Sequence, residues 1–104
     1  MAQTYKIKWT RSSANELDDI LAYLADKSIQ GLETFRAALR DTLDRLSVLP
    51  FSGAVFEKSP ADEVRELLVG SYRVFYRVLE RPKRIQLMHL RHVARQDPQL
   101  SELT

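Results

Sequence analysis

The hydrophobic period of this sequence changes once, from helical in the first half to strand-like in the second, and this change most narrows the possible folds. Between residues 13 and 49, apolar side chains recur every three or four positions, which is typical of amphipathic helices. From residue 64 to 93 they alternate with polar ones or form short runs, as in strands. A chain of 104 residues forms one domain, so we expect a helical layer packed on a sheet.

The first half predicts one strand and two helices. Residues 5–9 alternate apolar side chains with lysines, which indicates a half-buried strand that stops near Thr10–Arg11. Ser13 stands three residues before Glu16, the spacing of a capping box at a helix start. The predicted helices cover 13–27 and 32–49, separated by a break at 28–31 and ended by Pro50. Helices joined by so short a break form an antiparallel hairpin.

The second half predicts a loop followed by three strands. Pro50–Glu63 is rich in proline, glycine and serine and indicates a loop, whereas Gly70–Ser71 and Glu80–Lys83 indicate tight turns. The residues from 96 to 104, interrupted by a proline, are expected to be a flexible tail. The predicted strands are 64–69, 72–79 and 84–93. The predicted fold is therefore a single α+β domain over 1–104, in the order β-α-α-β-β-β, with the helical hairpin on an antiparallel sheet.

Alternation along the strands predicts which side chains are buried. Tyr72, Val74, Tyr76 and Val78 share one face, which we expect beneath the helices, and Trp9 is a further core candidate. The last strand is apolar on both faces, as in a central strand. By the same alternation, His89 is expected to line the core beside Ile85 and Leu87.

The charge distribution points to an acidic partner and to the cytoplasm. Residues 64–95 carry eight Lys and Arg against two Glu, a net charge of +6 in a chain whose total is +2. Such a surface attracts nucleic acid or an acidic protein segment, although a solvated sheet face has the same composition. The chain has no cysteine, no apolar run long enough to span a membrane and no visible signal peptide. We therefore expect a cytoplasmic protein with no membrane partner.

Several short motifs, in this order and spacing, carry a resemblance to a known family. They are Ile7-Lys8-Trp9-Thr10, Leu46 to Gly53 with its Leu-Pro-Phe-Ser-Gly ending, Arg65-Glu66-Leu67, Gly70 to Val78, and His92-Val93-Ala94-Arg95. Over nearly the whole chain, from Tyr5 to about Asp97, the sequence resembles the RelE/ParE superfamily of toxins, which includes the ParE-like plasmid stabilisation proteins. The resemblance implies a toxin of a type II toxin–antitoxin system, neutralised by a cognate antitoxin that wraps the helical hairpin and the sheet.

The resemblance also implies two alternative targets. In the nuclease branch, which cleaves mRNA on the ribosome, Arg73 and Arg95 match the phosphate-binding arginines, and paired guanidinium donors suit a phosphate. His92 is the acid–base candidate, because an imidazole exchanges protons near neutral pH. The branch's lysines are replaced by Val64 and Glu66, where a carboxylate would repel RNA, and its C-terminal tyrosine is replaced by Ser101.

These departures favour the ParE branch, which inhibits DNA gyrase and is not an enzyme; a RelE-like ribosome-dependent endoribonuclease is the alternative. A folded antitoxin-binding relic without a target is a third possibility. Strand alternation separates Arg91 from His92, and His92 also has a purely structural interpretation near a strand end. No metal and no cofactor are predicted, since no phosphate loop, carboxylate pair or helical His pair occurs. The residues predicted to bind the antitoxin or the target are Arg65, Arg73, Arg77, Arg91 and Arg95.

Overall fold

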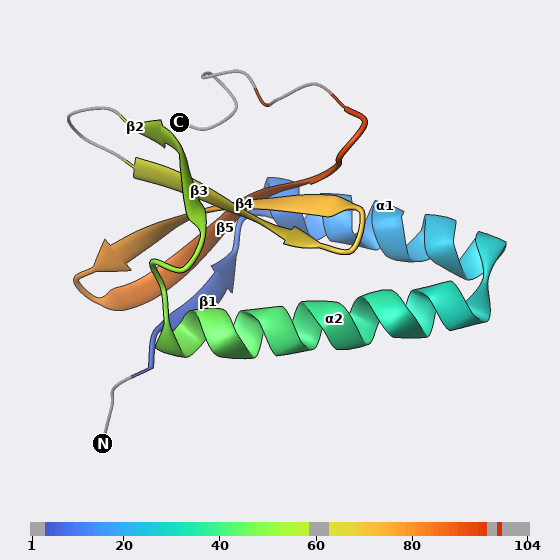
Figure 1. Ribbon diagram of the computed structural model, residues 1–104, viewed down its shortest axis with the longest axis horizontal. Coiled ribbons are helices and arrows are strands. Elements are labelled where there is room, and N and C mark those ends of the chain that lie inside the picture. Colours follow the sequence, from blue (N-terminus) through green and yellow to red (C-terminus); the bar gives the residue numbers. More distant parts are fainter. Residues whose placement is uncertain (1–3, 59–62, 96–97, 99–104) are drawn as a thin grey trace.

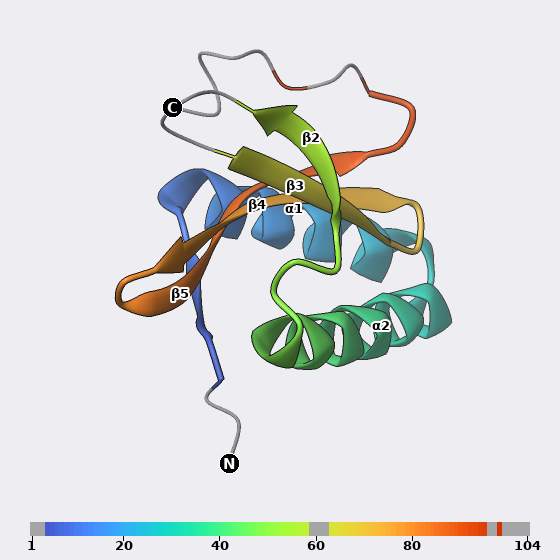
Figure 2. The same ribbon diagram turned by 60° about the vertical axis from the view of Figure 1, so that its left-hand side comes forward.

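The structure has two layers, a helical hairpin and a five-stranded sheet (Figure 1). It is a computed structural model that describes residues 4–58, 63–95 and 98. The helices α1 and α2 run antiparallel and lie together on one face of the sheet (Figures 1 and 2). The elements are β1 (Lys6–Trp9), α1 (Arg11–Lys27), α2 (Ile29–Val48), β2 (Ala54–Lys58), β3 (Glu63–Val69), β4 (Tyr72–Glu80) and β5 (Lys83–His92). The predicted α+β class is confirmed.

The strands are ordered β1-β5-β4-β3-β2 across the sheet. Strands β2 to β5 form consecutive antiparallel pairs, whereas β1 is parallel to β5, so the sheet is mixed rather than wholly antiparallel. The predicted central position of the last strand is confirmed, because β5 lies between β1 and β4. The predicted turn at Gly70–Ser71 is also confirmed: Val69 pairs with Tyr72, and Gly70 has φ +60°, which glycine adopts at no steric cost.

The prediction that residues 50–63 form only a loop was wrong. Residues 54–58 form β2, an edge strand in which Ala54 pairs with Glu66 and Val55 with Arg65. A register shift follows between Val55 and Glu57, so the strand lacks the regular alternation that would reveal it. The loop signals of Pro50 and Gly53 belong to the short connection before it.

The predicted start of α1 and the break between the helices were also wrong in detail. Thr10, not Ser13, caps α1: its hydroxyl accepts a hydrogen bond from the Ser13 N–H at 3.1 Å, and Glu16 belongs to no capping box. Only Ser28 separates the helices. Its N–H donates to the Leu24 carbonyl, and its hydroxyl accepts from the Gly31 N–H at 3.0 Å. One serine therefore ends α1 and caps α2, and Gly31 lies in the first turn of α2.

The main core lies between the helices and the sheet. Its buried members include Ile20, Phe35, Leu39 and Leu46 from the helices and Val74, Tyr76, Ile85, Leu87 and Leu90 from the strands, with Trp9 partly buried against them. A smaller cluster of Val64, Phe75 and Met88, with Phe56 packed on it, lies on the other face. The predicted burial of the Tyr72–Val78 face beneath the helices is confirmed.

A bulge in β5 corrects the prediction for His89. Phe75 pairs with His89, but the next residue, Tyr76, pairs with Leu87, so Met88 is the extra residue in β5. The shift interrupts the alternation, and Leu90, not His89, joins Ile85 and Leu87 in the core. His89 is buried all the same and contacts Glu16.

Two remaining expectations concern membranes and the tail. Neither helix, within the described part of the chain, is both long and apolar enough to cross a lipid bilayer. The predicted flexible tail, 96–104, lies outside the described residues except for Pro98.

Candidate functional site

A groove opens where the end of β5 and the β3–β4 turn face α1. It has a volume of about 660 Å³. Its lining residues are Asp19, Ile20, Tyr23 and Leu24 from α1, Ser71 and Tyr72 at the start of β4, and His92 and Arg95 at and beyond the end of β5. Helix α1 runs past these strand ends, so Tyr23 of α1 faces Tyr72 of β4 across the groove. Here the predicted catalytic candidates His92 and Arg95 lie together.

A second groove adjoins the first along the helical hairpin. It shares Leu24, Ser71 and Tyr72 with the first and continues to Phe35 and Ala38 of α2. Tyr72 forms the common floor: its ring meets Phe35 edge-on at 5.3 Å and His92 edge-on at 5.4 Å between centroids. Burial raises the pKa of the Tyr72 hydroxyl, and the neighbouring Tyr23 raises it further. We call the two grooves together the helix groove.

His92 is exposed but held in place. Its Nδ1 accepts a hydrogen bond from the Ala94 N–H at 3.1 Å, and its carbonyl accepts one from the Arg95 N–H at 2.9 Å. The bond from Ala94 and the contact with Tyr72 hold the ring at the rim of the helix groove. Because Nδ1 accepts, Nε2 is the ring nitrogen that carries the proton in the neutral tautomer.

Arg73 lies elsewhere. It pairs across the sheet with Arg91, and its Nη2 lies 2.7 Å from Glu66 Oε2. Its guanidinium also stacks on Phe75, at 4.9 Å from the ring centroid, and Phe75 belongs to the face that carries the smaller cluster. Arg73 is not among the described residues that line the helix groove. The structure therefore brings His92 and Arg95 together but leaves Arg73 apart from them.

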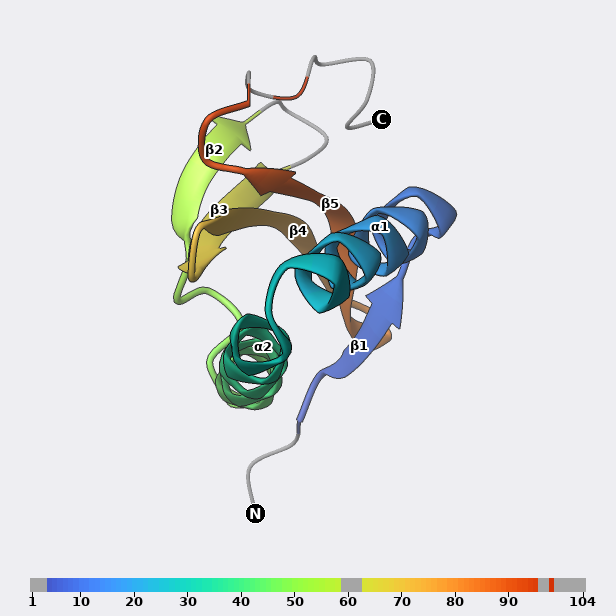
Figure 3. The same ribbon diagram turned by 90° about the vertical axis from the view of Figure 1, so that its right-hand side faces the viewer.

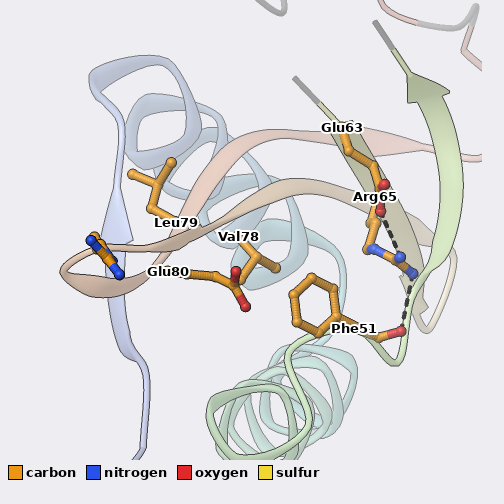
Figure 4. Close-up of a pocket in the computed structure, with 7 residues that line it drawn as sticks. Phe51, Glu63, Arg65, Val78, Leu79 and Glu80 are labelled. Atoms are coloured by element: carbon orange, nitrogen blue, oxygen red, sulfur yellow. Dashed lines mark hydrogen bonds and ion pairs between the residues drawn. The ribbon is translucent and has the colours of Figure 1, made fainter. Parts of the chain in front are cut away.

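Arg65 supports the chain before β2 (Figure 4). One guanidinium nitrogen donates to the carbonyls of Phe51 and Gly53, at 3.0 and 2.7 Å, and another forms an ion pair with Glu63. The guanidinium also lies over the Phe51 ring. These contacts line a pocket of about 320 Å³ that is closed on the other side by the β4–β5 hairpin. In this position Arg65 holds the loop before β2, and its side chain is only 18% exposed.

The two other predicted binding arginines differ in exposure. Arg91 is 8% exposed, and its Nε lies 3.7 Å from Glu16 Oε2. Arg77 is half-buried in β4, opposite Gln86. The five predicted arginines thus occupy three places. Arg65 lies in the pocket beside Phe51, and Arg95 lies at the rim of the helix groove. The other three, Arg73, Arg77 and Arg91, lie on the sheet face opposite the helices.

A sequence model of a known family matches most of the chain. Residues 7–97 match the sequence model of a family described as the ParE toxin of the type II toxin–antitoxin system parDE. The chain belongs to the ParE toxin family.

Solved structures of similar fold include RelE-type and ParE-type proteins. A chain of the toxin–antitoxin complex RelBE2 from Mycobacterium tuberculosis superposes with TM-score 0.60 at 19% identity, covering 86% of this chain and 98% of that one. The chromosomal ParDE system of P. aeruginosa gives 0.56 at 23%, covering 86% and 97%. The archaeal RelE–RelB complex of Pyrococcus horikoshii gives 0.56 at 22%, covering 89% and 99%. A search of curated proteins gave no significant match.

Two residues of this ParE-family chain have a larger role than the sequence suggested. Glu16, expected in a capping box, instead reaches His89, Arg91 and the Leu90 N–H of β5. Tyr76, expected only as core, also holds the chain before β2: its hydroxyl accepts from the Gly53 N–H and donates to the Pro50 carbonyl, both at 2.9 Å. The only sign of this role in the sequence is the predicted burial of Tyr76, because a buried tyrosine hydroxyl must find a hydrogen-bond partner.

The part of the chain that the structure describes holds no cluster of three or more histidine or carboxylate side chains that could bind a metal. The polar groups that line the helix groove include the carboxylate of Asp19, the imidazole of His92, the guanidinium of Arg95 and the tyrosine hydroxyls, around an apolar floor. Such a surface suits an apolar segment with a polar edge.

Proposed function

We propose that this ParE-family toxin acts by binding and inhibiting DNA gyrase, and that a cognate antitoxin neutralises it. The observation that carries the proposal is the contact of Arg73 with Glu66, at 2.7 Å. An mRNA endonuclease must stabilise negative charge on phosphoryl oxygens with donors set close together. Here the guanidinium that the resemblance assigns to this task already faces a carboxylate, and it lies apart from His92 and Arg95.

The antitoxin half of the proposal rests on the solved relatives and on the helix groove. The three solved relatives named above are a RelBE2 toxin–antitoxin complex, a ParDE toxin–antitoxin system and a RelE–RelB complex. The groove has an apolar floor around Tyr72 with Asp19, His92 and Arg95 at its rim. An amphipathic segment with apolar residues on one face fits a groove of this kind. Gyrase acts in the cytoplasm, so the proposal also places the protein there.

A supercoiling assay with purified gyrase tests the proposal. Addition of the toxin should stop supercoiling and accumulate cleaved DNA, and prior addition of the protein encoded by the adjacent gene should restore the activity. The Arg73→Ala variant should inhibit nearly as well as the native chain, because its guanidinium is engaged with Glu66. Full supercoiling activity at micromolar toxin would rule out gyrase as the target.

A RelE-like, ribosome-dependent endoribonuclease is the second candidate, favoured by the shared position of His92 and Arg95. Primer extension on mRNA after induction would then reveal new ends linked to codons. His92→Gln and Arg95→Gln would abolish both these ends and toxicity, since proton transfer and phosphate binding would be lost. Growth arrest without new ends, together with inhibited gyrase, excludes this candidate.

A further inference from the structure

A group of hydrogen-bond donors lies on the face of the sheet that the helices do not cover. In β1, Ile7 and Trp9 pack on the main core, so Lys6 and Lys8 point to the opposite face. In β5, Ile85 and Leu87 belong to the same core, so Arg84 and Gln86 also point away from the helices. We call Lys6, Lys8, Arg84 and Gln86 the donor patch.

The register of the two strands makes these four side chains neighbours. Lys6 pairs with Arg84 and Lys8 with Gln86 in the parallel ladder. Paired residues of adjacent strands lie about 4.8 Å apart, and alternate residues of one strand about 6.6 Å apart. Lys6, Lys8 and Arg84 are exposed. The four side chains therefore form a rectangle of donors at the β1 edge of the sheet.

No carboxylate in the described part of the chain forms an ion pair with the donor patch. Among the residues that the structure describes, the ion pairs of carboxylates involve Arg65, Arg73, His89 and Arg91, and none involves Lys6, Lys8 or Arg84. Strand β1 leads through Thr10 into α1 (Figure 3), whose first turn begins with Arg11 and contains no acidic residue. Positive charge therefore continues from the patch toward the positive end of the α1 helix dipole.

We propose that the donor patch binds the phosphate backbone of duplex DNA. The separation of Lys6 from Lys8 along the strand is close to that of neighbouring phosphates in one nucleic-acid strand, and a guanidinium and an amide supply directed donors to phosphate oxygens. The patch contains no aromatic side chain on which an unpaired base could stack, as single-strand binding surfaces do. The contact is thus one with the backbone of a duplex and carries no sequence preference.

This contact adds to the proposed inhibition of gyrase but does not depend on it. A toxin that holds gyrase on cleaved DNA lies within reach of the DNA segments entering and leaving the enzyme. The donor patch lies on the sheet face opposite the helices, so the helix groove and the patch can be occupied at the same time. DNA binding can be measured without gyrase, and the two proposals can fail separately.

Fluorescence anisotropy with a short mixed-sequence duplex, at several salt concentrations, tests the inference. With three cations on phosphates, the logarithm of the association constant should fall against the logarithm of salt with a slope of about −2 to −3. The Lys6→Gln/Lys8→Gln variant should lower this slope by about two and weaken binding about tenfold at low salt. Lys6→Arg/Lys8→Arg should bind as the native chain does.

The matched control is Arg36→Gln/Arg40→Gln, which removes the same charge from exposed positions of α2. It should leave the slope unchanged. An equal loss in this control, or native binding by Lys6→Gln/Lys8→Gln, would overturn the proposal. So would tighter binding to a single-stranded RNA of equal length. Aggregation of the lysine variant without any change in DNA affinity would overturn it too, because the lysines would then serve to protect an edge strand.

Discussion

The carboxylate of Glu16 in α1 accepts a hydrogen bond from the backbone N–H of Leu90 in β5 at 3.1 Å, although 74 positions separate the two residues. Strand β1 pairs with β5 only as far as Leu87, so beyond Leu87 no strand of the described residues lies along this edge. Thr10 and Glu16 take its place: Thr10 N–H donates to the Leu87 carbonyl, and Glu16 accepts from Leu90. The beginning of α1 thus continues the edge that β1 leaves open.

We predict that Glu16→Gln lowers the free energy of unfolding by about 1–3 kcal/mol. The amide keeps the shape but loses the charge that faces His89 Nδ1, at 3.1 Å, and Arg91 Nε, at 3.7 Å. Urea denaturation provides the measurement. Asp18→Asn, an exposed change of the same kind in α1, should alter the free energy by less than about 0.5 kcal/mol. Equal effects of the two substitutions would show that the Glu16 contacts contribute no stability.

Alanine substitutions at two glycines should have opposite effects. A Cβ at Gly53 would lie 2.6 Å from the Tyr76 hydroxyl and 2.7 Å from the Glu66 carbonyl, so Gly53→Ala should cost about 1–3 kcal/mol. At Gly31 the nearest atoms are 3.5 Å away, so an added Cβ fits in the helix. In the unfolded chain, alanine has less backbone freedom than glycine, so less entropy is lost on folding. Gly31→Ala should therefore stabilise the protein, by up to about 1 kcal/mol. Thermal unfolding of both variants is the test.

Tyr76→Phe tests the same junction from the other side. The substitution leaves the Gly53 N–H and the Pro50 carbonyl without their 2.9 Å partner in a buried place. We expect a loss of about 1–3 kcal/mol, together with faster amide exchange at Gly53. Unchanged exchange at Gly53 would mean that the Tyr76 hydroxyl does not hold the chain.

The fold could be predicted because most of its elements have simple periodicities. The helical hairpin, the β3–β4 turn and the Tyr72–Val78 core face follow from local patterns that tertiary packing reinforces. Two features break the periodicity, and both were mispredicted. The shift between Val55 and Glu57 hid β2, and the extra residue in β5 moved His89 out of register with Ile85 and Leu87.

The candidate site was less predictable, because it depends on contacts between distant segments. Alternation indicated that Arg91 and His92 point to opposite faces of β5, and in the structure His92 lines the helix groove whereas Arg91 pairs with Arg73. It could not show that Glu66 would reach Arg73, or that Glu16 would reach past Thr10 to β5. A side chain as long as glutamate has several partners within reach, and only the packing of α1 against β5 decides between them.

Alkaline pH should destabilise the protein through two tyrosines. Burial raises the pKa of Tyr72 and of Tyr76 above the ordinary value of 10.0, and for Tyr76 the bond to Gly53 and the charge of Arg65 oppose part of this increase. The unfolded chain then loses its phenolic protons at lower pH than the folded chain does. The stability that these two tyrosines contribute is therefore fully present below pH 10 and is lost as the pH rises through their pKa values in the folded state. Urea midpoints measured from neutral to alkaline pH should show this decline. Tyr72→Phe should reduce it, and a decline of unchanged size would exclude Tyr72 as a cause.

The helix groove should control antitoxin affinity. Tyr23 is 56% exposed and lies at the wall of the groove, where an apolar antitoxin segment would cover it. Tyr23→Asp places a charge against that segment. The charge must lose its water when the antitoxin binds, so the dissociation constant should rise at least about tenfold. Val48→Asp makes a comparable change at an exposed position, 52% accessible, at the far end of α2, and should leave the affinity nearly unchanged. Calorimetric titration with the protein of the adjacent gene would measure both, and a larger loss for Val48→Asp would place the antitoxin outside the groove.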